Sequence, residues 1–183
     1  MRPPETDPLR DDSAGRSALD LVYREHHEFV WRSLLRLGVP PTQVEDAMHE
    51  TFLVVTRRLS EFAGRSSLRT WLFAIAMRVA MSLRRDAARE RRHLDRFGQE
   101  LHSRTSEPHH QHDASHVLHQ LLATLDDERR AMFIMAELEG MTGPEIAEVT
   151  GAKLPTIYSR LRSARAAMEQ AARELSGPPR RSP

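Results

Sequence analysis

Several absences limit what this 183-residue chain can be. It has no cysteine, which excludes disulfides, thiolate zinc sites and cysteine nucleophiles and favours a reducing cytoplasm. No apolar run approaches the roughly 20 residues that a membrane-spanning helix needs. The proline-rich, acidic start lacks the apolar stretch of a signal peptide, so we expect residues 1–17 to form a disordered tail of a cytoplasmic protein. The length allows one domain or two small ones.

A large net charge of either sign is also lacking, because 27 basic side chains nearly balance 26 acidic ones and leave a net charge of +1. Taken alone, this balance argues against a polyanionic partner. The charge is nevertheless divided into four blocks, −4 over 1–56, +7 over 57–96, −7 over 97–148 and +5 over 149–183. Two separated basic blocks indicate two contacts with anionic partners. Arginine, which dominates both, suits phosphate and guanine, although a GC-rich genome would also enrich it.

Strand signals are nearly absent, and apolar residues recur at helical spacing, so we expect an all-α fold. Residues 18–88 predict a bundle of at least three helices with short links. The first helix covers about 18–37 and ends at Gly38; Thr42 and Glu45 form a T-x-x-E capping box for the second; Ser66 or Ser67 caps the third. The predicted inner face of the first helix consists of Leu21, Val22, Phe29, Val30, Leu34 and Leu37.

A flexible linker over 89–115 and a second helical domain over 116–172, followed by a tail over 173–183, are expected next, because periodicity is lost and then returns. Two short segments separated by Gly151 predict a helix-turn-helix, with Thr142, Pro144 and Glu145 as the cap signature. Ile157, Leu161, Ala164 and Met168 are expected to point inward. The residues left to face a DNA major groove are Thr156, Tyr158, Ser159, Arg160, Arg162 and Arg165.

Each signal has a plainer alternative. The second segment could belong to an ordinary helical hairpin with a solvated arginine face. Arginines of the third helix, placed near Trp71 and Phe73, could hold a nucleic-acid strand on which the aromatics stack, but a tryptophan at helical spacing is more often core. The acidic face with Asp46, Glu50 and Leu53 could be merely solvated or could dock a partner helix.

Metal binding and catalysis have weak support. Six histidines fall within 18 residues, but the first four lie in the expected linker, where nothing fixes ligand geometry. Glycine-rich phosphate loops, a nucleophile elbow and an HExxH pattern are missing from the sequence. We therefore expect neither an enzyme nor a cofactor or metal site. The histidines are His102, His109, His110, His112, His116 and His119.

Three stretches occur in an order and spacing that resembles the sigma factors of bacterial RNA polymerase, of the small two-domain extracytoplasmic-function (ECF) type. They are VEDAMHETFLVVTRRLSEF, FAGRSSLRTWLFAIAMRVAMSLRR and MTGPEIAEVTGAKLPTIYSRLRSAR. The resemblance covers about residues 18–88 and 116–170. It implies a protein that binds the polymerase core and directs promoter recognition, strand opening and transcription initiation.

The resemblance also implies roles for individual residues. The clamp helices of the largest polymerase subunit would bind Asp46, His49, Glu50, Phe52 and Leu53, although His49 stands where the family usually has glutamine. The helix-turn-helix residues would read the minus-thirty-five duplex, and the linker would thread through the polymerase. The unpaired minus-ten strand would be held by Ala63, Gly64, Arg65, Ser66, Arg69, Trp71, Arg78 and Arg85.

Other readings remain open from the sequence. A stand-alone helix-turn-helix regulator with an N-terminal sensing or dimerisation bundle explains the C-terminal half equally well, but it gives no reason for the basic third helix. A metal sensor built on the histidine linker would bind zinc or nickel. An anti-sigma factor that folds against both halves would be a further partner, although the sequence names none, and no membrane insertion is expected.

Overall fold

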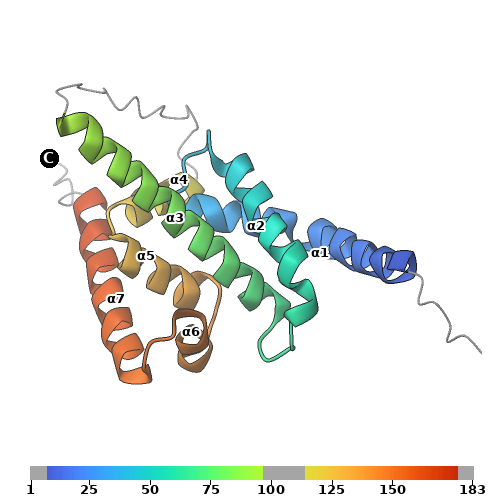
Figure 1. The fold of residues 1–183 in the computed structure, drawn as a ribbon. Coiled ribbons are helices and arrows are strands. Elements are labelled where there is room, and N and C mark those ends of the chain that lie inside the picture. The colour runs from blue at the N-terminus through green and yellow to red at the C-terminus, as the bar shows by residue number, and fades with distance from the viewer. Residues whose placement is uncertain (1–7, 97–113, 177–183) are drawn as a thin grey trace, which may run out of the picture.

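The computed structural model of this chain describes residues 8–96 and 114–176. This part of the chain is helical and contains no strand, which confirms the all-α expectation (Figure 1). Its α-helices are α1 (Pro8–Arg36), α2 (Val44–Arg58), α3 (Leu68–Arg96), α4 (Ala114–Ala123), α5 (Asp127–Phe133), α6 (Gly143–Thr150) and α7 (Leu154–Ser176); a 3-10 turn, η1 (Leu59–Glu61), follows α2 and a π-helical turn, η2 (Ile134–Leu138), follows α5.

The N-terminal half is the predicted three-helix bundle, in which α1, α2 and α3 pack pairwise against one another. Val30, Leu34, Val44, Val55 and Leu72 are completely buried at the centre. Burial of a side chain of this size is worth about 1.5–3 kcal/mol, so the shared core rather than intrinsic helix propensity holds the bundle together.

The first helix differs from the prediction at two points. It begins at Pro8, so the expected disordered tail is wrong over residues 8–17, whereas residues 1–7 lie outside the described part. Proline is tolerated in a first helical turn, where its missing N–H would have had no partner. Leu21, predicted to face inward, is 57% exposed, because it shares a stripe with the exposed Glu25 and Glu28 rather than with Val22.

Two further helix ends lie beyond the predicted positions. α3 continues to Arg96, so the expected linker start at residue 89 is wrong over 89–96. This segment has no glycine or proline and is rich in good helix formers, but its sequence contains no apolar stripe, and residues 89–93 are exposed. The apolar periodicity is therefore lost there although the helix continues. α7 likewise extends to Ser176, beyond the predicted start of the tail at 173.

The helix ends of the N-terminal bundle agree with the prediction at Ser67 and Gly38 but not at Thr42. The capping box at Thr42 is wrong: Gln43 is the N-cap and makes no side-chain cap bond, because a turn closed by the Gln43 N–H on the Pro40 carbonyl delays the helix. Ser67 caps α3 as predicted, its Oγ accepting the Thr70 N–H at 3.0 Å. Gly38 ends α1 with a φ of 89°, a conformation that favours glycine.

The two halves of the chain share one core. Buried apolar residues of both halves form a continuous cluster, and α3 packs against α6 as well as against α1 and α2. Figure 1 shows α3 running between the N-terminal helices and α5 to α7. None of the helices in the described residues is long and apolar enough to cross a membrane.

Candidate nucleic-acid and protein interfaces

The helix-turn-helix has the cap geometry that its sequence predicts. Thr142 Oγ1 accepts the Glu145 N–H, and the Glu145 carboxylate accepts the Thr142 N–H at 2.8 Å, which completes a capping box at the start of α6. These hydrogen bonds to Thr142 hold the pKa of Glu145 below its ordinary value. Gly151 ends α6 in the left-handed region, with a φ of 71°. The turn between α6 and α7 is therefore fixed by local chemistry at both ends.

The second helix of the motif, α7, presents the predicted inner and outer residues. Ile157, Leu161, Ala164 and Met168 are buried, so they anchor the helix. All six predicted DNA-facing residues are accessible: Arg160 is half-buried, and Thr156, Tyr158, Ser159, Arg162 and Arg165 are exposed.

Carboxylates from the acidic block engage two of these arginines. Arg160 Nη2 lies 2.6 Å from Glu128 Oε1 on α5, and Arg165 Nε donates to Glu137 Oε1 on η2 at 2.7 Å. Such pairs orient a guanidinium as well as neutralising it. The sequence analysis did not identify Glu128 and Glu137, because they lie 32 and 28 positions before their partners and no local pattern links them.

The acidic face of α2 lies on the surface, with one exception. Asp46, His49, Glu50 and Leu53 are exposed and recur at helical spacing. Phe52 is 8% exposed, so it lies on the core side of α2 rather than on this face. It lies about 100° around the helix from Leu53, and its ring packs edge-on against Tyr23 with centroids 4.8 Å apart.

The segment predicted to hold a nucleic-acid strand is largely accessible. Ala63, Gly64 and Arg65 are exposed and Ser66 is half-buried. Trp71 is half-buried, with its ring centroid 5.3 Å from that of Phe62. Phe73, however, is fully buried and belongs to the core, so it is not the exposed aromatic that was expected beside the arginines.

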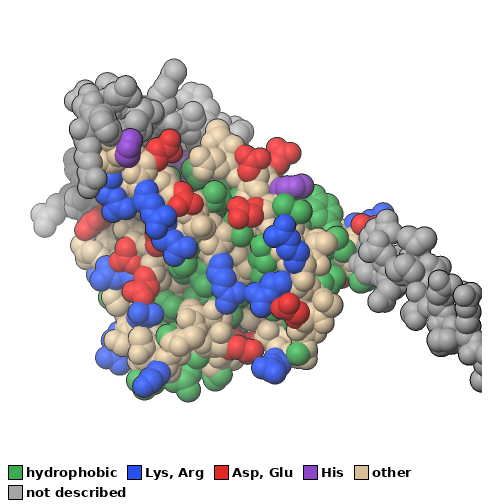
Figure 2. Space-filling view, viewed as in Figure 1, with side chains coloured by type: hydrophobic (Ala, Val, Ile, Leu, Met, Phe, Trp, Pro, Cys, Tyr) green, Lys and Arg blue, Asp and Glu red, His purple; other side chains and the backbone are tan. Residues whose placement is uncertain are grey.

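The arginines of α3 lie in different environments. Arg78 and Arg85 are exposed, whereas Arg69 and Arg84 contact carboxylates of the C-terminal half. On the face shown in Figure 2, basic side chains are interspersed with acidic ones and do not form a single basic patch. The separate charge blocks of the sequence thus come together in the fold.

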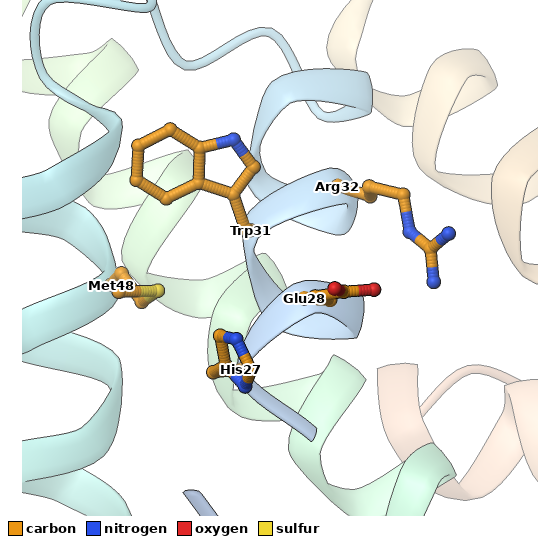
Figure 3. Close-up of a pocket in the computed structure, with 5 residues that line it drawn as sticks. All are labelled: His27, Glu28, Trp31, Arg32 and Met48. Carbon is orange, nitrogen blue, oxygen red and sulfur yellow. The ribbon is translucent and has the colours of Figure 1, made fainter. Parts of the chain in front are cut away.

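A groove of about 290 Å³ between α1 and α2 was not foreseen from the sequence. Trp31, which is 37% exposed, extends from α1 toward Met48 on α2, while Glu28 and Arg32 extend to the other side of α1 (Figure 3). His27 completes the lining and stacks on Tyr23. The groove combines apolar surface with charges at its edge, a composition that suits a protein segment.

The histidines that were considered as metal ligands fall in two places. His102, His109, His110 and His112 lie outside the described residues. On α4, His116 contacts Gln120 at 3.0 Å. Within residues 8–96 and 114–176, no three side chains of the metal-ligating types are grouped to hold an ion.

The fold defines a class: an all-helical protein with an N-terminal three-helix bundle and a C-terminal helix-turn-helix, a motif typical of DNA-binding proteins. The family model of sigma-70 region 2 matches residues 22–90 and that of sigma-70 region 4 matches residues 115–168. The chain belongs to the RNA polymerase sigma factors of the ECF type.

Individual relatives agree with this assignment. RNA polymerase sigma factor NccH of Alcaligenes xylosoxydans is 30% identical over 88% of this chain and 94% of its own. RNA polymerase sigma factor YlaC of Bacillus subtilis is 27% identical over 82% of this chain and 89% of its own. Sigma factor RpoE of Bartonella quintana, solved with the anti-sigma factor NepR, has a similar fold, with a TM-score of 0.66 at 23% identity over 86% of this chain and 95% of that one.

Proposed function

We propose that this sigma factor uses α7 to read the minus-thirty-five duplex and the start of α3 with its preceding loop to hold the unpaired minus-ten strand. The observation that carries the proposal is the helix-turn-helix: α6 is capped at both ends, Ile157 and Leu161 anchor α7, and Tyr158 and Arg162 are exposed. Arginine in a major groove donates two hydrogen bonds to guanine, and a tyrosine packs against bases or phosphates.

For the minus-ten contact, the loop at 62–67 and α3 supply both required chemistries. Arg65 and Arg78 offer exposed guanidiniums for the phosphate backbone. Trp71 is the half-buried aromatic on which an unpaired base can stack, an interaction worth about 1–3 kcal/mol per base. The strand would replace duplex stacking with stacking on protein.

The exposed face of Asp46, His49, Glu50 and Leu53 is the proposed docking site for the clamp helices of the polymerase largest subunit. It combines two carboxylates with an apolar side chain that is 44% exposed, the pairing of charge and anchor that helix-binding surfaces use. An anti-sigma factor is a further partner that this surface could bind, since sigma factor RpoE of Bartonella quintana was solved in complex with the anti-sigma factor NepR.

Joining the two DNA contacts through the polymerase supplies the affinity that each lacks. Phosphate contacts alone give salt-sensitive binding of roughly 10⁻⁴ to 10⁻⁶ M. Tethering makes the second contact intramolecular and raises avidity about 10²–10⁴-fold when the geometry permits. The protein thus acts by binding in the cytoplasm, with the N-terminal bundle of α1 to α3 and the C-terminal helices α4 to α7 as its two DNA-binding modules.

Run-off transcription with the core polymerase of the source bacterium tests the proposal. Mapping of transcription starts after induced expression first supplies the native promoters. Purified protein should then direct core enzyme to those starts, and core alone should not. Failure to bind core together with autonomous binding to an operator would instead support a stand-alone helix-turn-helix regulator, a reading that the sigma-factor family matches do not favour.

A further inference from the structure

An ion pair fixes one of the arginines on the outer surface of α7. Arg165 Nε donates to Glu137 Oε1 at 2.7 Å, although the two side chains are 57% and 36% exposed. A distance this short is typical of a charge-assisted hydrogen bond. Exposed ion pairs add little to stability, because solvent screens the charges and two long side chains lose freedom. The main consequence of the pair is therefore the placement of the Arg165 guanidinium.

Glu137 belongs to a turn that the core holds in place. In η2, the Glu139 N–H donates to the Ile134 carbonyl at 2.9 Å, five positions back, which makes the turn π-helical. Ile134 and Met135 of the same turn are fully buried. A π-helical turn is rare and is frequently found at functional sites. The carboxylate of Glu137 thus extends from an anchored element toward its partner.

Arg165 shares a face of α7 with the two residues that the proposed function assigns to base recognition. Tyr158, Arg162 and Arg165 are four and three positions apart, so their side chains project from the same face. All three are exposed. Arg160 lies about 200° around the helix from Arg162, where it binds a carboxylate of α5. The pair of Arg165 therefore lies on the flank of α7 that the proposed function places against DNA.

The atoms used by the pair leave the terminal donors of Arg165 available. Among the contacts of the described residues, Arg165 uses only its Nε. Its two terminal amino groups, Nη1 and Nη2, are left to donate to an anion. Arg160, by contrast, pairs through Nη2 and so commits a terminal donor to the protein. Arg165 is thus oriented by the protein without losing the donors that DNA needs.

We propose that Glu137 is a positioning residue that holds Arg165 for contact with a phosphate of the minus-thirty-five duplex. The inference rests on the proposed role of α7 in reading that duplex and adds a residue to it. Recognition helices contact base edges mainly through their N-terminal residues, whereas Arg165 lies in the middle of α7, which begins at Leu154. A phosphate is therefore its expected partner, a contact that fixes the orientation of the protein on DNA.

A carboxylate at this place has two opposing effects on DNA binding. Its negative charge repels the phosphates, an effect that salt screens. Its hydrogen bond restricts the rotamers of Arg165, so less conformational entropy is lost when the guanidinium binds DNA. Removal of Glu137 should tighten binding if repulsion dominates and weaken binding if positioning dominates. The proposed role requires the second sign.

Glu137→Leu in the holoenzyme tests this sign, because leucine has neither a charge nor an acceptor. Footprinting on a mapped native promoter at fixed salt should show affinity about tenfold weaker, the effect of losing one charge-assisted hydrogen bond. The loss should be equal on native and altered minus-thirty-five sequences, since a phosphate contact carries no sequence information directly. Unchanged or tighter binding would overturn the proposal. A loss confined to the native sequence would overturn the phosphate contact.

Glu137→Gln separates the hydrogen bond from the charge. Glutamine is neutral but keeps a carbonyl oxygen that can accept from Arg165 Nε. Because a neutral hydrogen bond has about half the strength of a charge-assisted one, we expect binding about threefold weaker than in the wild type. This variant keeps the side-chain shape and decides the question if circular dichroism shows Glu137→Leu to be misfolded. Binding as tight as the wild type would then count against positioning.

Glu169→Leu and Glu169→Gln are the matched controls. Glu169 lies one turn after Arg165 on the same face of α7, is exposed and pairs with Arg173 at 4.0 Å. Loss of its charge should leave promoter affinity unchanged or raise it through reduced repulsion. Weakening equal to that of the Glu137 variants would contradict the proposal, because any lost carboxylate near this face would then suffice.

Arg165→Ala completes a double-mutant cycle. Alone it should weaken binding on both sequences and reduce the salt dependence by about one phosphate contact. In this background Glu137→Leu should not weaken binding further, because the guanidinium that it positions is absent. A further tenfold loss would show that Glu137 acts through another part of the protein and would refute the positioning role.

The wild-type holoenzyme separates this inference from the proposed function. If the wild type fails to occupy the mapped promoter, the proposed function itself is wrong. If the wild type occupies the promoter and Glu137→Leu binds equally well, only the role of Glu137 is wrong. Weaker binding by Glu137→Leu, with unimpaired binding by Glu169→Leu and no further loss in the double variant, is the result that we expect.

Discussion

Arg130 donates a hydrogen bond to the main-chain carbonyl of Leu37, 93 positions away in the sequence, with an Nη1···O distance of 3.3 Å. Arg130 is 4% exposed. Its guanidinium also donates to the carbonyls of Leu122 and Leu125 at 2.8 and 3.0 Å. One side chain thereby satisfies main-chain acceptors at the end of α1 and around the α4–α5 turn. Burial, together with the nearby positive charge of Arg84, lowers the pKa of Arg130.

Substitution of Arg130 should be among the most destabilising single changes. Arg130→Leu leaves several buried carbonyls without donors, and we expect the free energy of unfolding to fall by about 3 kcal/mol. Urea unfolding followed by circular dichroism measures the loss. Arg129→Leu is the matched control, because Arg129 is exposed and its change should cost under about 1 kcal/mol. Equal losses in both variants would contradict the structural role of Arg130.

The capping box of α6 makes a pH-dependent contribution to stability. Because the pKa of Glu145 is lowered in the folded protein, the stabilisation is present above the ordinary glutamate pKa of about 4.5 and is lost as the pH falls through the folded-state pKa. Glu145→Gln should therefore have a lower free energy of unfolding than the wild type at pH 7, and this difference should become smaller at pH 3. Urea midpoints at the two pH values provide the measurement, and Glu148→Gln is the exposed control. A deficit that is the same at both pH values would be evidence against the cap.

Local signals in the sequence predicted the parts of this fold that local chemistry fixes. The capping box at Thr142, the glycine ends at Gly38 and Gly151 and the buried stripe of α7 are all in place. The prediction was wrong where a helix has no apolar stripe, because such a stripe indicates a buried face and not the helix itself. The end of α3 lacks the stripe, yet it is helical. Contacts such as that of Glu139 with Arg69 join residues 70 positions apart, and no local sequence pattern predicts them.

Substitutions at the adjacent residues Phe52 and Leu53 allow the stability of the fold and the binding to core polymerase to be tested separately. Phe52→Ala removes a buried ring and should lower the free energy of unfolding by about 3–5 kcal/mol. Leu53→Ala removes an exposed side chain and should change stability by no more than about 0.5 kcal/mol, while weakening the proposed binding to core polymerase. Thermal unfolding and a core pull-down measure the two effects. Unimpaired core binding by Leu53→Ala would remove this residue from the docking face.

The carboxylates of the docking face can be tested by charge reversal. Asp46→Arg with Glu50→Arg should abolish core binding and leave the helical circular dichroism spectrum intact, because both side chains are exposed. Glu169→Arg with Glu174→Arg makes the same total charge change on exposed positions of α7 and should retain core binding. Loss of helicity in the first double variant would mean that these residues hold the fold rather than a partner.

Arg162 and Tyr158 test the proposed reading of the minus-thirty-five element. Both are exposed on α7, and the hydroxyl end of Tyr158 lies beside Gly143 at the start of α6, where a Cβ would come within 2.9 Å of it. If each residue contacts base edges, its replacement by alanine should weaken promoter occupancy by about 1–3 kcal/mol. Footprinting of the holoenzyme on a mapped native promoter measures the occupancy.

Arg173→Ala is the control for these two variants, because Arg173 is exposed near the C-terminal end of α7 and pairs within that helix. Its replacement removes one positive charge but should leave promoter occupancy unchanged. A contact to phosphate instead of bases would also be recognisable. If Arg162 contacts phosphate, its replacement by alanine should weaken binding equally on native and altered minus-thirty-five sequences and should reduce the salt dependence of binding. If Arg162 contacts bases, the alanine variant should instead lose discrimination between the two sequences.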